Sequence, residues 1–244
     1  MVRDTYRERM YERYVTTHTS VLYDLSCEAF KRQQAAFESY MESHLPEDKW
    51  AKILDVGCGA GAFLHYLHEK GYANATGIDI SPEQVAMAQK LGIKNVECAE
   101  VMEYLEDSPN RFDVVTALDV LEHFKKEEVI PLLEAIRASL RSGGVIILQT
   151  PNADGPFGSR YRYADFSHEV VFTRTSISQV LAMAGFRRIA VYPTGPVCHG
   201  ILSAVRWILW QVIKTLLRAY LAVETGSFRG HILTQDLLAV AVKE

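Results

Sequence analysis

The chain of 244 residues is long enough to form one large domain with a substantial core. Hydrophobic residues make up 48% of it and charged residues 23%, which is typical of globular proteins and excludes disordered, collagen-like and low-complexity classes. The formal net charge of −4 disfavours binding through a strongly basic surface, so we expect no nucleic-acid partner.

The N-terminal segment and the cysteines indicate a cytoplasmic protein. The segment MVRDTYRERMYERY is charged throughout and lacks the apolar core of a signal peptide. The cysteines lie far apart and form no CxxC pair, so we expect reduced thiols rather than disulfides or a zinc site. Arg206, Lys214 and Arg218 interrupt the long apolar stretch at 201–223, which makes it a poor membrane-spanning helix.

The elements alternate along the chain. Residues 3–44 show helical periodicity with many charges and aromatics, and Pro46 ends this run. Beyond it we expect strands at 52–56, 75–80, 94–98, 111–118, 145–150, 187–192 and 233–242, and helices at 60–70, 82–91, 125–140, 173–185 and 196–224. Continuous apolar strands that alternate with helices predict an α/β fold with a mostly parallel sheet covered on both faces.

No repeat or linker divides the sequence, so we expect a single domain over 1–244. Its parts are a helical lid at 1–45, a Rossmann-like core at 46–195 and 231–244, and a helical insertion at 196–230.

A glycine turn follows the first expected strand. In the run ILDVGCGAG, Gly57, Gly59 and Gly61 are spaced G-x-G-x-G rather than the G-x-G-x-x-G of dinucleotide binders. Glycine permits a tight turn and lets a ligand approach the backbone. Asp55 lies within the strand, and Asp79 ends the second strand, where an acid binds ribose hydroxyls in such folds. The pattern therefore predicts a ligand with a ribose at this edge of the sheet.

Four segments together resemble the class I S-adenosylmethionine-dependent methyltransferases. They read ILDVGCGAGAF, GIDIS, FDVVTALDVLEH and LRSGGVIILQTPN, and the resemblance covers about 52–192 and the last strand. It implies a doubly wound, seven-stranded sheet of order 3-2-1-4-5-7-6 with the seventh strand antiparallel, and residues 233–242 fit that seventh strand.

The resemblance also implies roles for single residues toward S-adenosyl-L-methionine, whose product is S-adenosyl-L-homocysteine. The glycine loop faces the methionine part, Asp55 lies near the amino group, and Asp79 takes the ribose hydroxyls. Backbone groups at the end of the fourth strand approach the methionine moiety. The residues implied for the adenine and for that strand end are Ile80, Glu100, Val101, Leu118 and Asp119, with Glu100 standing where Asp is commoner.

Methyl transfer is an in-line displacement, and a hydroxyl acceptor also has to lose its proton, usually to His, Asp or Glu. Glu122 and His123 follow the fourth strand, close to the expected methyl group. His123 is one candidate base; the alternative is that it caps a helix or touches the cofactor. A comparable pair has been linked to a metal in quinone O-methyltransferases, but the sequence shows no full ligand set and we expect no metal.

A polar loop after the fifth strand, YRYADFSHE at 161–169, lies where the family places acceptor residues. His168 is the leading candidate base and Asp165 its orienting carboxylate, and the alternative is a structural loop. Arg160, Tyr163 and Glu169 are candidate substrate contacts, although a solvated surface explains the arginine as well.

The N-terminal segment supplies two further candidates. Family members often fold such a segment over the cofactor, so Tyr14 and His18 are expected to reach the acceptor and exclude water. The alternative is that they form the aromatic face of a packing helix.

The insertion at 199–223 is amphipathic. Its polar arc holds His199, Ser203, Arg206, Gln211, Lys214 and Thr215, with Trp207 and Trp210 on the same side, and aliphatic residues fill the opposite side. We expect the aliphatic side to cover the sheet or a partner subunit, because it is too large to leave in water. Three arrangements stay open: a lid or substrate wall, a homodimer interface, and peripheral contact with a membrane or lipid-linked acceptor.

These features predict methyl transfer to a hydroxyl of a small molecule or glycan. The loop and the insertion resemble methyltransferases of bacterial surface-polysaccharide and sugar-modification pathways, which favours a sugar acceptor in polysaccharide or secondary-metabolite biosynthesis. An N-methyltransferase and a quinone-type O-methyltransferase are the alternatives within the family. A cofactor-binding scaffold without catalysis is the alternative outside it.

Overall fold

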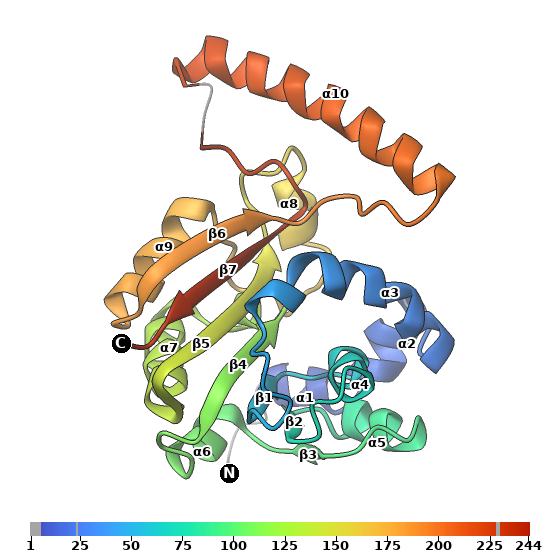
Figure 1. Cartoon of the computed structure of the whole chain (residues 1–244), viewed down its shortest axis with the longest axis vertical. Coiled ribbons are helices and arrows are strands. Elements are labelled where there is room, and N and C mark those ends of the chain that lie inside the picture. The colour runs from blue at the N-terminus through green and yellow to red at the C-terminus, as the bar shows by residue number, and fades with distance from the viewer. Residues whose placement is uncertain (1–5, 23, 228–229) are drawn as a thin grey trace.

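The computed structural model describes residues 6–22, 24–227 and 230–244. Within them, seven strands form one sheet of order β3-β2-β1-β4-β5-β7-β6, as the sequence predicts (Figure 1). The strands are β1 (Ile53–Val56), β2 (Ala75–Asp79), β3 (Val96–Cys98), β4 (Phe112–Leu118), β5 (Leu140–Pro151), β6 (Arg187–Pro193) and β7 (Asp236–Val242).

The strand directions match the expected topology. β1 pairs in parallel with β2 and β4, and β4 pairs in parallel with β5. β7 runs antiparallel to both of its neighbours, β5 and β6. The carboxyl ends of β1, β2 and β4 therefore meet at one edge, which is where open α/β sheets bind ligands.

Helices cover both faces of the sheet, as Figure 1 shows. One apolar cluster joins the sheet to α3 (Cys27–Tyr40), α4 (Ala62–Glu69) and α5 (Pro82–Lys90). The other joins it to α6 (Val101–Glu106), α7 (Lys126–Ser139) and α9 (Arg174–Met183). Ile53 and Leu54, adjacent in β1, belong to opposite clusters because successive side chains of a strand point to opposite faces.

The N-terminal part differs from one continuous helical run. It consists of α1 (Tyr6–Tyr11), η1 (Val15–Thr19), α2 (Ser20–Leu22), α3 and η2 (Glu42–His44). Ser26 has extended backbone and its hydroxyl accepts a hydrogen bond from Ala29 N, so a new helix begins after it. The first five residues of the predicted lid lie outside the described part of the chain.

Short elements between the strands were not predicted. α6 has six residues and begins at Glu100, whose carboxylate accepts hydrogen bonds from the amides of Met102 and Glu103. η3 (Leu121–His123) follows β4, and α8 (Gly158–Arg162) lies in the long loop after β5. Helices of three to six residues are too short to leave a hydrophobic period in the sequence.

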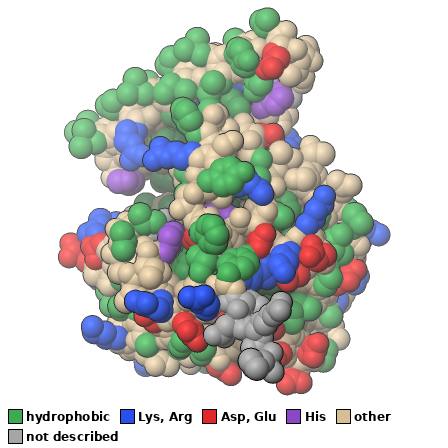
Figure 2. Space-filling view, turned by 180° about the vertical axis from the view of Figure 1, so that it is seen from behind, with side chains coloured by type: hydrophobic (Ala, Val, Ile, Leu, Met, Phe, Trp, Pro, Cys, Tyr) green, Lys and Arg blue, Asp and Glu red, His purple; other side chains and the backbone are tan. Residues whose placement is uncertain are grey.

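The helix of the insertion, α10 (Ile201–Thr225), stands away from the body of the fold (Figure 1). The expectation that its aliphatic side covers the sheet is wrong. Five aliphatic side chains of α10 are between 57% and 87% exposed, namely Ile201, Leu202, Ile208, Leu209 and Leu216. Figure 2 shows hydrophobic side chains along the outer side of this helix. Ser203, on the polar arc, is the buried residue of the helix. Polar side chains and Trp210 face the body instead, across cavities rather than across packed side chains.

Candidate functional site

Two adjoining cavities open at the carboxyl ends of β1, β2 and β4. The first, of about 530 Å³, is lined by the β2 residues Ile78 and Asp79, and we call it the β2 cavity. The second, of about 500 Å³, contains His123 and His168, and we call it the histidine cavity. Both walls include six residues: Tyr14, Gly57, Gly59, Gln84, Asp119 and His123. The cavities are therefore neighbouring parts of one site.

The glycine turn forms the wall between them. Gly57 has φ +63°, and a Cβ there would lie 2.4 Å from Val120 Cγ2. Gly61 has φ +85°, and a Cβ there would lie 2.9 Å from Ile93 Cγ2. Positive φ and these close approaches together require glycine. The turn is tied to β2 because Cys58 N donates to Ile78 O at 3.0 Å.

Asp79 is held at the end of β2 with its carboxylate toward the β2 cavity. Gly59 N donates to one carboxylate oxygen and Ser81 N to the other, each at 2.8 Å. Burial raises the pKa of Asp79, while both amides favour its ionised form. A carboxylate has about four lone-pair sites, so both oxygens can still accept hydroxyl hydrogen bonds. This arrangement suits the ribose role that the sequence predicts.

The rest of the β2 cavity has an apolar wall. Ile80, Val101, Ala99 and Phe124 line it beside Glu100. The helix-capping bonds of Glu100 both use Oε2, which leaves Oε1 without a role in the cap. An adenine ring fits an apolar wall with one carboxylate oxygen at its edge.

The end of β4 carries a strained residue. Asp119 has φ +55°, a conformation that costs a non-glycine residue of order 1–3 kcal/mol and that clusters at functional sites. Gln149 Nε2 donates to both of its carboxylate oxygens, at 3.3 and 3.1 Å. Asp119 and Leu118 both line the histidine cavity.

Asp55 lies in the same wall and is 2% exposed. It accepts a hydrogen bond from Thr116 Oγ1 at 2.7 Å, and burial raises its pKa to about 7. It lies at the base of the glycine turn, and its contact with the cofactor's amino group stays a prediction.

The N-terminal segment closes over this site. Ser81 Oγ donates to Tyr11 O at 2.7 Å, and Gln84 Nε2 donates to Thr19 Oγ1 at 2.9 Å. Tyr14 lines both cavities and His18 lines the histidine cavity. The structure therefore places Tyr14 and His18 at the site, as the lid prediction requires.

Asp165 connects the N-terminal lid to the loop that carries His168. It accepts hydrogen bonds from Tyr14 Oη and from the amide and hydroxyl of Ser167, and its Oδ2 lies 3.3 Å from His18 Nε2. Burial opposes ionisation of Asp165, but the hydrogen bonds outweigh it and hold the pKa below its usual value. No described contact joins the side chains of Asp165 and His168, so the predicted orienting role is wrong for this pair.

The Asp165 carboxylate acts on His123 instead. Ser167 Oγ donates to Asp165 Oδ1 at 2.7 Å and lies 2.8 Å from His123 Nδ1. Because the Ser167 hydrogen is used toward Asp165, Ser167 Oγ accepts from His123 Nδ1–H. Burial and the neighbouring His168 lower the pKa of His123 to about 4. His123 is therefore neutral at pH 7, with an unprotonated Nε2.

His168 is oriented by the backbone. Its Nδ1 lies 2.9 Å from Tyr161 O, and a carbonyl can only accept, so Nδ1 carries the proton of neutral His168. Nε2 is then the free base. The His168 and His123 rings are 4.8 Å apart and nearly perpendicular.

Glu122 lies close to the two imidazoles and is fully buried. Thr150 Oγ1 donates to its Oε2 at 3.0 Å, and Oε1 has no partner within the described residues. Burial and Asp119 raise the pKa of Glu122 well above its usual value. Ligand atoms of Glu122, His123 and His168 all lie within 4.8 Å of one another, an arrangement that can hold a metal ion. This set could not be predicted from sequence spacing, because His168 is 45 residues from His123.

Three candidate substrate residues lie outside the two cavities. Arg160 is exposed, and Tyr163 is 78% exposed. Tyr6 Oη donates to Glu169 Oε1, which ties Glu169 to the lid. The structure therefore brings Tyr14 and His18 to the site but does not bring Arg160, Tyr163 or Glu169 there.

Three further residues that shape the site were not predicted from the sequence. Ser167 bridges Asp165 and His123, the Tyr161 carbonyl fixes His168, and Asp236 begins β7. Burial and Asp119 raise the pKa of Asp236 to about 7. Their roles depend on contacts between distant segments, which a spacing pattern does not carry.

Comparison with known proteins agrees with this geometry. Residues 19–191, more than half of the chain, match the model of the family described as "Methyltransferase domain". The chain is 30% identical over 118 residues to the ubiquinone biosynthesis O-methyltransferase of Idiomarina loihiensis, and 34% over 106 residues to that of Pseudomonas fluorescens strain Pf0-1. These matches span 46% and 41% of this chain, and only 47% and 44% of the relatives.

Solved structures share the fold over most of the chain. An S-adenosylmethionine-dependent methyltransferase from Archaeoglobus fulgidus matches with a TM-score of 0.65 at 22% identity, over 88% of this chain and 94% of that one. Phosphoethanolamine N-methyltransferase 2 from Haemonchus contortus, in complex with S-adenosyl-L-methionine, matches with a TM-score of 0.61 at 20% identity, over 99% of this chain and 58% of that one.

No helix of the described residues is long and apolar enough to cross a bilayer. The family match begins within the lid, ends within β6, and includes most of the residues that line the two cavities. The chain belongs to the methyltransferase-domain family, and it shares its fold with solved S-adenosylmethionine-dependent methyltransferases.

Proposed function

We propose that the enzyme methylates a hydroxyl oxygen of a small molecule held in the histidine cavity. The observation that carries this proposal is the free Nε2 of His168, fixed by the Tyr161 carbonyl in a cavity that shares its wall with the β2 cavity. Bound S-adenosyl-L-methionine supplies an electrophilic methyl group, and the protein has to align the acceptor and accept its proton.

The chain's own residues divide these tasks. Asp79 takes the ribose hydroxyls, Glu100 Oε1 faces the adenine amino group, and Ile80 and Val101 hold the ring. Asp55, Gly57, Gly59, Leu118 and Asp119 hold the methionine part. His168 Nε2 removes the acceptor proton, and neutral His123 orients the hydroxyl. Tyr14 and His18 close the cavity and exclude water.

An aromatic hydroxyl fits this site better than a sugar hydroxyl. Imidazole is a weak base, and a phenol, with a pKa of about 10 as in Tyr, releases its proton far more readily than an aliphatic alcohol. Leu22, Leu25, Phe30 and Phe37 supply an apolar wall for a ring. The names of the curated relatives point to quinone-type acceptors in those proteins, which supports the same class here.

The experiment is a methyl-transfer screen with labelled cofactor against catechols, quinols, sugars and amines. Turnover of a phenolic acceptor that falls in His168→Ala supports the proposal. Preference for a sugar would restore the glycan acceptor predicted from the sequence, and preference for an amine would replace O- by N-methylation. Tight S-adenosylhomocysteine binding without any turnover would favour a non-catalytic scaffold.

A further inference from the structure

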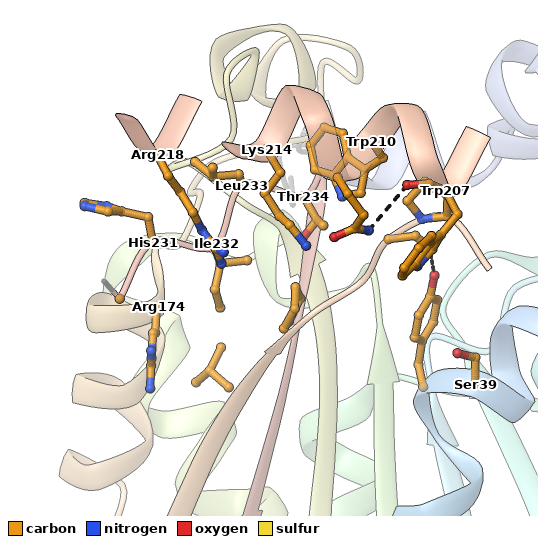
Figure 3. Close-up of a pocket in the computed structure, with 17 residues that line it drawn as sticks. Ser39, Arg174, Trp207, Trp210, Lys214, Arg218, His231, Ile232, Leu233 and Thr234 are labelled. Carbon is orange, nitrogen blue, oxygen red and sulfur yellow. Dashed lines mark hydrogen bonds between the residues drawn. The ribbon is translucent and has the colours of Figure 1, made fainter. Parts of the chain in front are cut away.

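A third cavity, of about 400 Å³, lies between α10, the first turn of α9 and residues 230–234 (Figure 3). We call it the basic cavity. Four basic residues from three segments line it, namely Arg174, Lys214, Arg218 and His231, and no carboxylate belongs to its wall in the described part of the chain. Lys214 and Arg218 project from the body-facing side of α10 into the gap (Figure 3).

These cations lack counter-ions. Within 6–22, 24–227 and 230–244, no side-chain hydrogen bond or ion pair joins Arg174, Lys214 or Arg218 to another residue. Burial and the positive charge of Arg218 lower the pKa of Lys214. His231 Nε2 is buried, again without a hydrogen-bond partner among these residues. Asp154 lies near His231, outside the wall, and burial raises its pKa against the effect of His231. Like charges gathered around a hollow favour an anionic occupant.

The basic cavity is linked to the active site by a row of adjoining cavities. A fourth cavity, of about 740 Å³, lies beneath α10, and we call it the helix cavity. It shares Phe37, Tyr161, Gln235 and Asp236 with the histidine cavity. It shares Tyr40, Gly195, Pro196, Trp210, Leu233 and Thr234 with the basic cavity. The adjoining cavities therefore form a row that runs from His168 to Lys214.

We propose that the basic cavity binds a phosphate group of the acceptor, remote from the oxygen that is methylated. The assignment of this phosphate to the acceptor rests on the proposed function. Phosphate carries about −1.5 to −2 charges and three acceptor oxygens, which matches several cations better than a carboxylate does. Arg218 offers a planar fork suited to phosphate oxygens, and Lys214 adds a point charge. The middle of the acceptor lies in the helix cavity against Trp210, Ile213 and Leu217.

The phosphate belongs either to a soluble ester or to a lipid headgroup, and the two sources differ experimentally. The soluble probe is inorganic pyrophosphate, titrated calorimetrically into the full chain with S-adenosylhomocysteine bound. The lipid probe is a vesicle of phosphatidylcholine with phosphatidylglycerol, compared by flotation with a vesicle of phosphatidylcholine alone. The test variant is Lys214→Gln/Arg218→Gln, and the matched control is Lys90→Gln, an exposed residue of α5.

Pyrophosphate should bind the wild type and the control, and bind the double variant at least tenfold more weakly. Loss of vesicle binding in the double variant assigns the phosphate to a lipid headgroup. Pyrophosphate binding without vesicle binding assigns it to a soluble ester. Failure of the wild type to bind either probe, or equal binding by the double variant, would overturn the proposal. The affinity for S-adenosylhomocysteine, measured on the same preparations, shows whether the variant is folded.

The link to the acceptor has its own readout. In the turnover assay, pyrophosphate should raise the KM of the acceptor and leave kcat unchanged, because it occupies one end of the acceptor's site. An unchanged KM at saturating pyrophosphate would refute the acceptor role. Absence of any turnover would instead refute the proposed function, while the calorimetric result would stand.

Discussion

His168 Nδ1 lies 2.9 Å from the backbone carbonyl oxygen of Tyr161. This contact decides which nitrogen of the ring is basic, and it does so with a group that has no pKa of its own. The base is therefore oriented by the fold of the loop and not by a carboxylate partner.

Replacement of His168 by Ala should lower turnover by about 10²-fold or more, the usual contribution of a general base. The affinity for S-adenosylhomocysteine should stay unchanged, because His168 is not among the residues proposed to hold the cofactor in either cavity. Single-turnover kinetics and calorimetry measure the two effects. Tyr163→Ala, in the same loop but 78% exposed, is the control. A larger loss in His123→Ala than in His168→Ala would transfer the role of base to His123.

The Asp79→Ala variant should bind S-adenosylhomocysteine about 10²- to 10⁴-fold more weakly. The carboxylate offers two ribose hydroxyls charge-assisted hydrogen bonds, each worth about 1.5–3 kcal/mol. Asp107→Ala changes an exposed carboxylate at the end of α6 and should have no effect. Isothermal titration measures both affinities. Equal affinities of the Asp79→Ala and Asp107→Ala variants would show that Asp79 does not bind the cofactor.

His123 should make the enzyme less stable in mild acid. Its folded pKa is about 4, below the value of about 6.5 expected for an unfolded chain. As pH falls through this window the unfolded state binds the proton first, so the contribution of neutral His123 is full above pH 6.5 and is lost toward pH 4.

The difference in unfolding free energy between wild type and His123→Gln, measured with urea at several pH values, isolates this effect. It should shrink as pH falls from 6.5 to 4, by at most about 1.4 kcal/mol per pH unit. The comparison is needed because Asp55 and Asp236, with pKa values raised to about 7, change stability in the opposite direction. A difference that stays constant over this range would show that His123 titrates normally.

Removal of metal should leave turnover unchanged. Methyl transfer needs alignment and proton removal, which the protein side chains supply. Activity is measured after dialysis against EDTA and again after addition of Mg²⁺ or Zn²⁺. Loss of activity that either cation restores would mean that Glu122, His123 and His168 work as a metal site rather than as a base and its neighbours.

The exposed aliphatic face of α10 should pair with a second copy of the chain. The face is too extensive for a typical monomer surface, and the basic residues that would attract anionic lipid line the inner cavities. In sedimentation velocity, the wild type should sediment as a dimer. The Leu209→Ser/Leu216→Ser variant should sediment as a monomer, and its affinity for S-adenosylhomocysteine should be unchanged. Met183→Ser, exposed on α9, is the control. A monomeric wild type that floats with anionic vesicles would assign this face to a membrane surface.

Local patterns predicted the glycine turn and the acid at the end of β2, because each depends on residues close together in the chain. The order of the strands was implied by the family resemblance and is confirmed. The acceptor half depends on long-range contacts: Ser167 meets His123 across 44 residues, and Tyr14 meets Asp165 across 151. The periodicity of α10 gave its two sides correctly. It could not tell which side faces the body, because that side meets a cavity instead of packed apolar residues.

The position of β7 determines when the sheet can be completed during synthesis. β7 lies between β5 and β6 and pairs with both. β6 and α10 therefore leave the ribosome before β7, the strand that joins β6 to the other strands of the sheet. β3, β2, β1, β4 and β5 can form a parallel sheet by then. Until residues 236–242 arrive, β5 has an open edge and α10 has no attachment at its second end, which makes this interval the one in which the nascent chain is most exposed to aggregation.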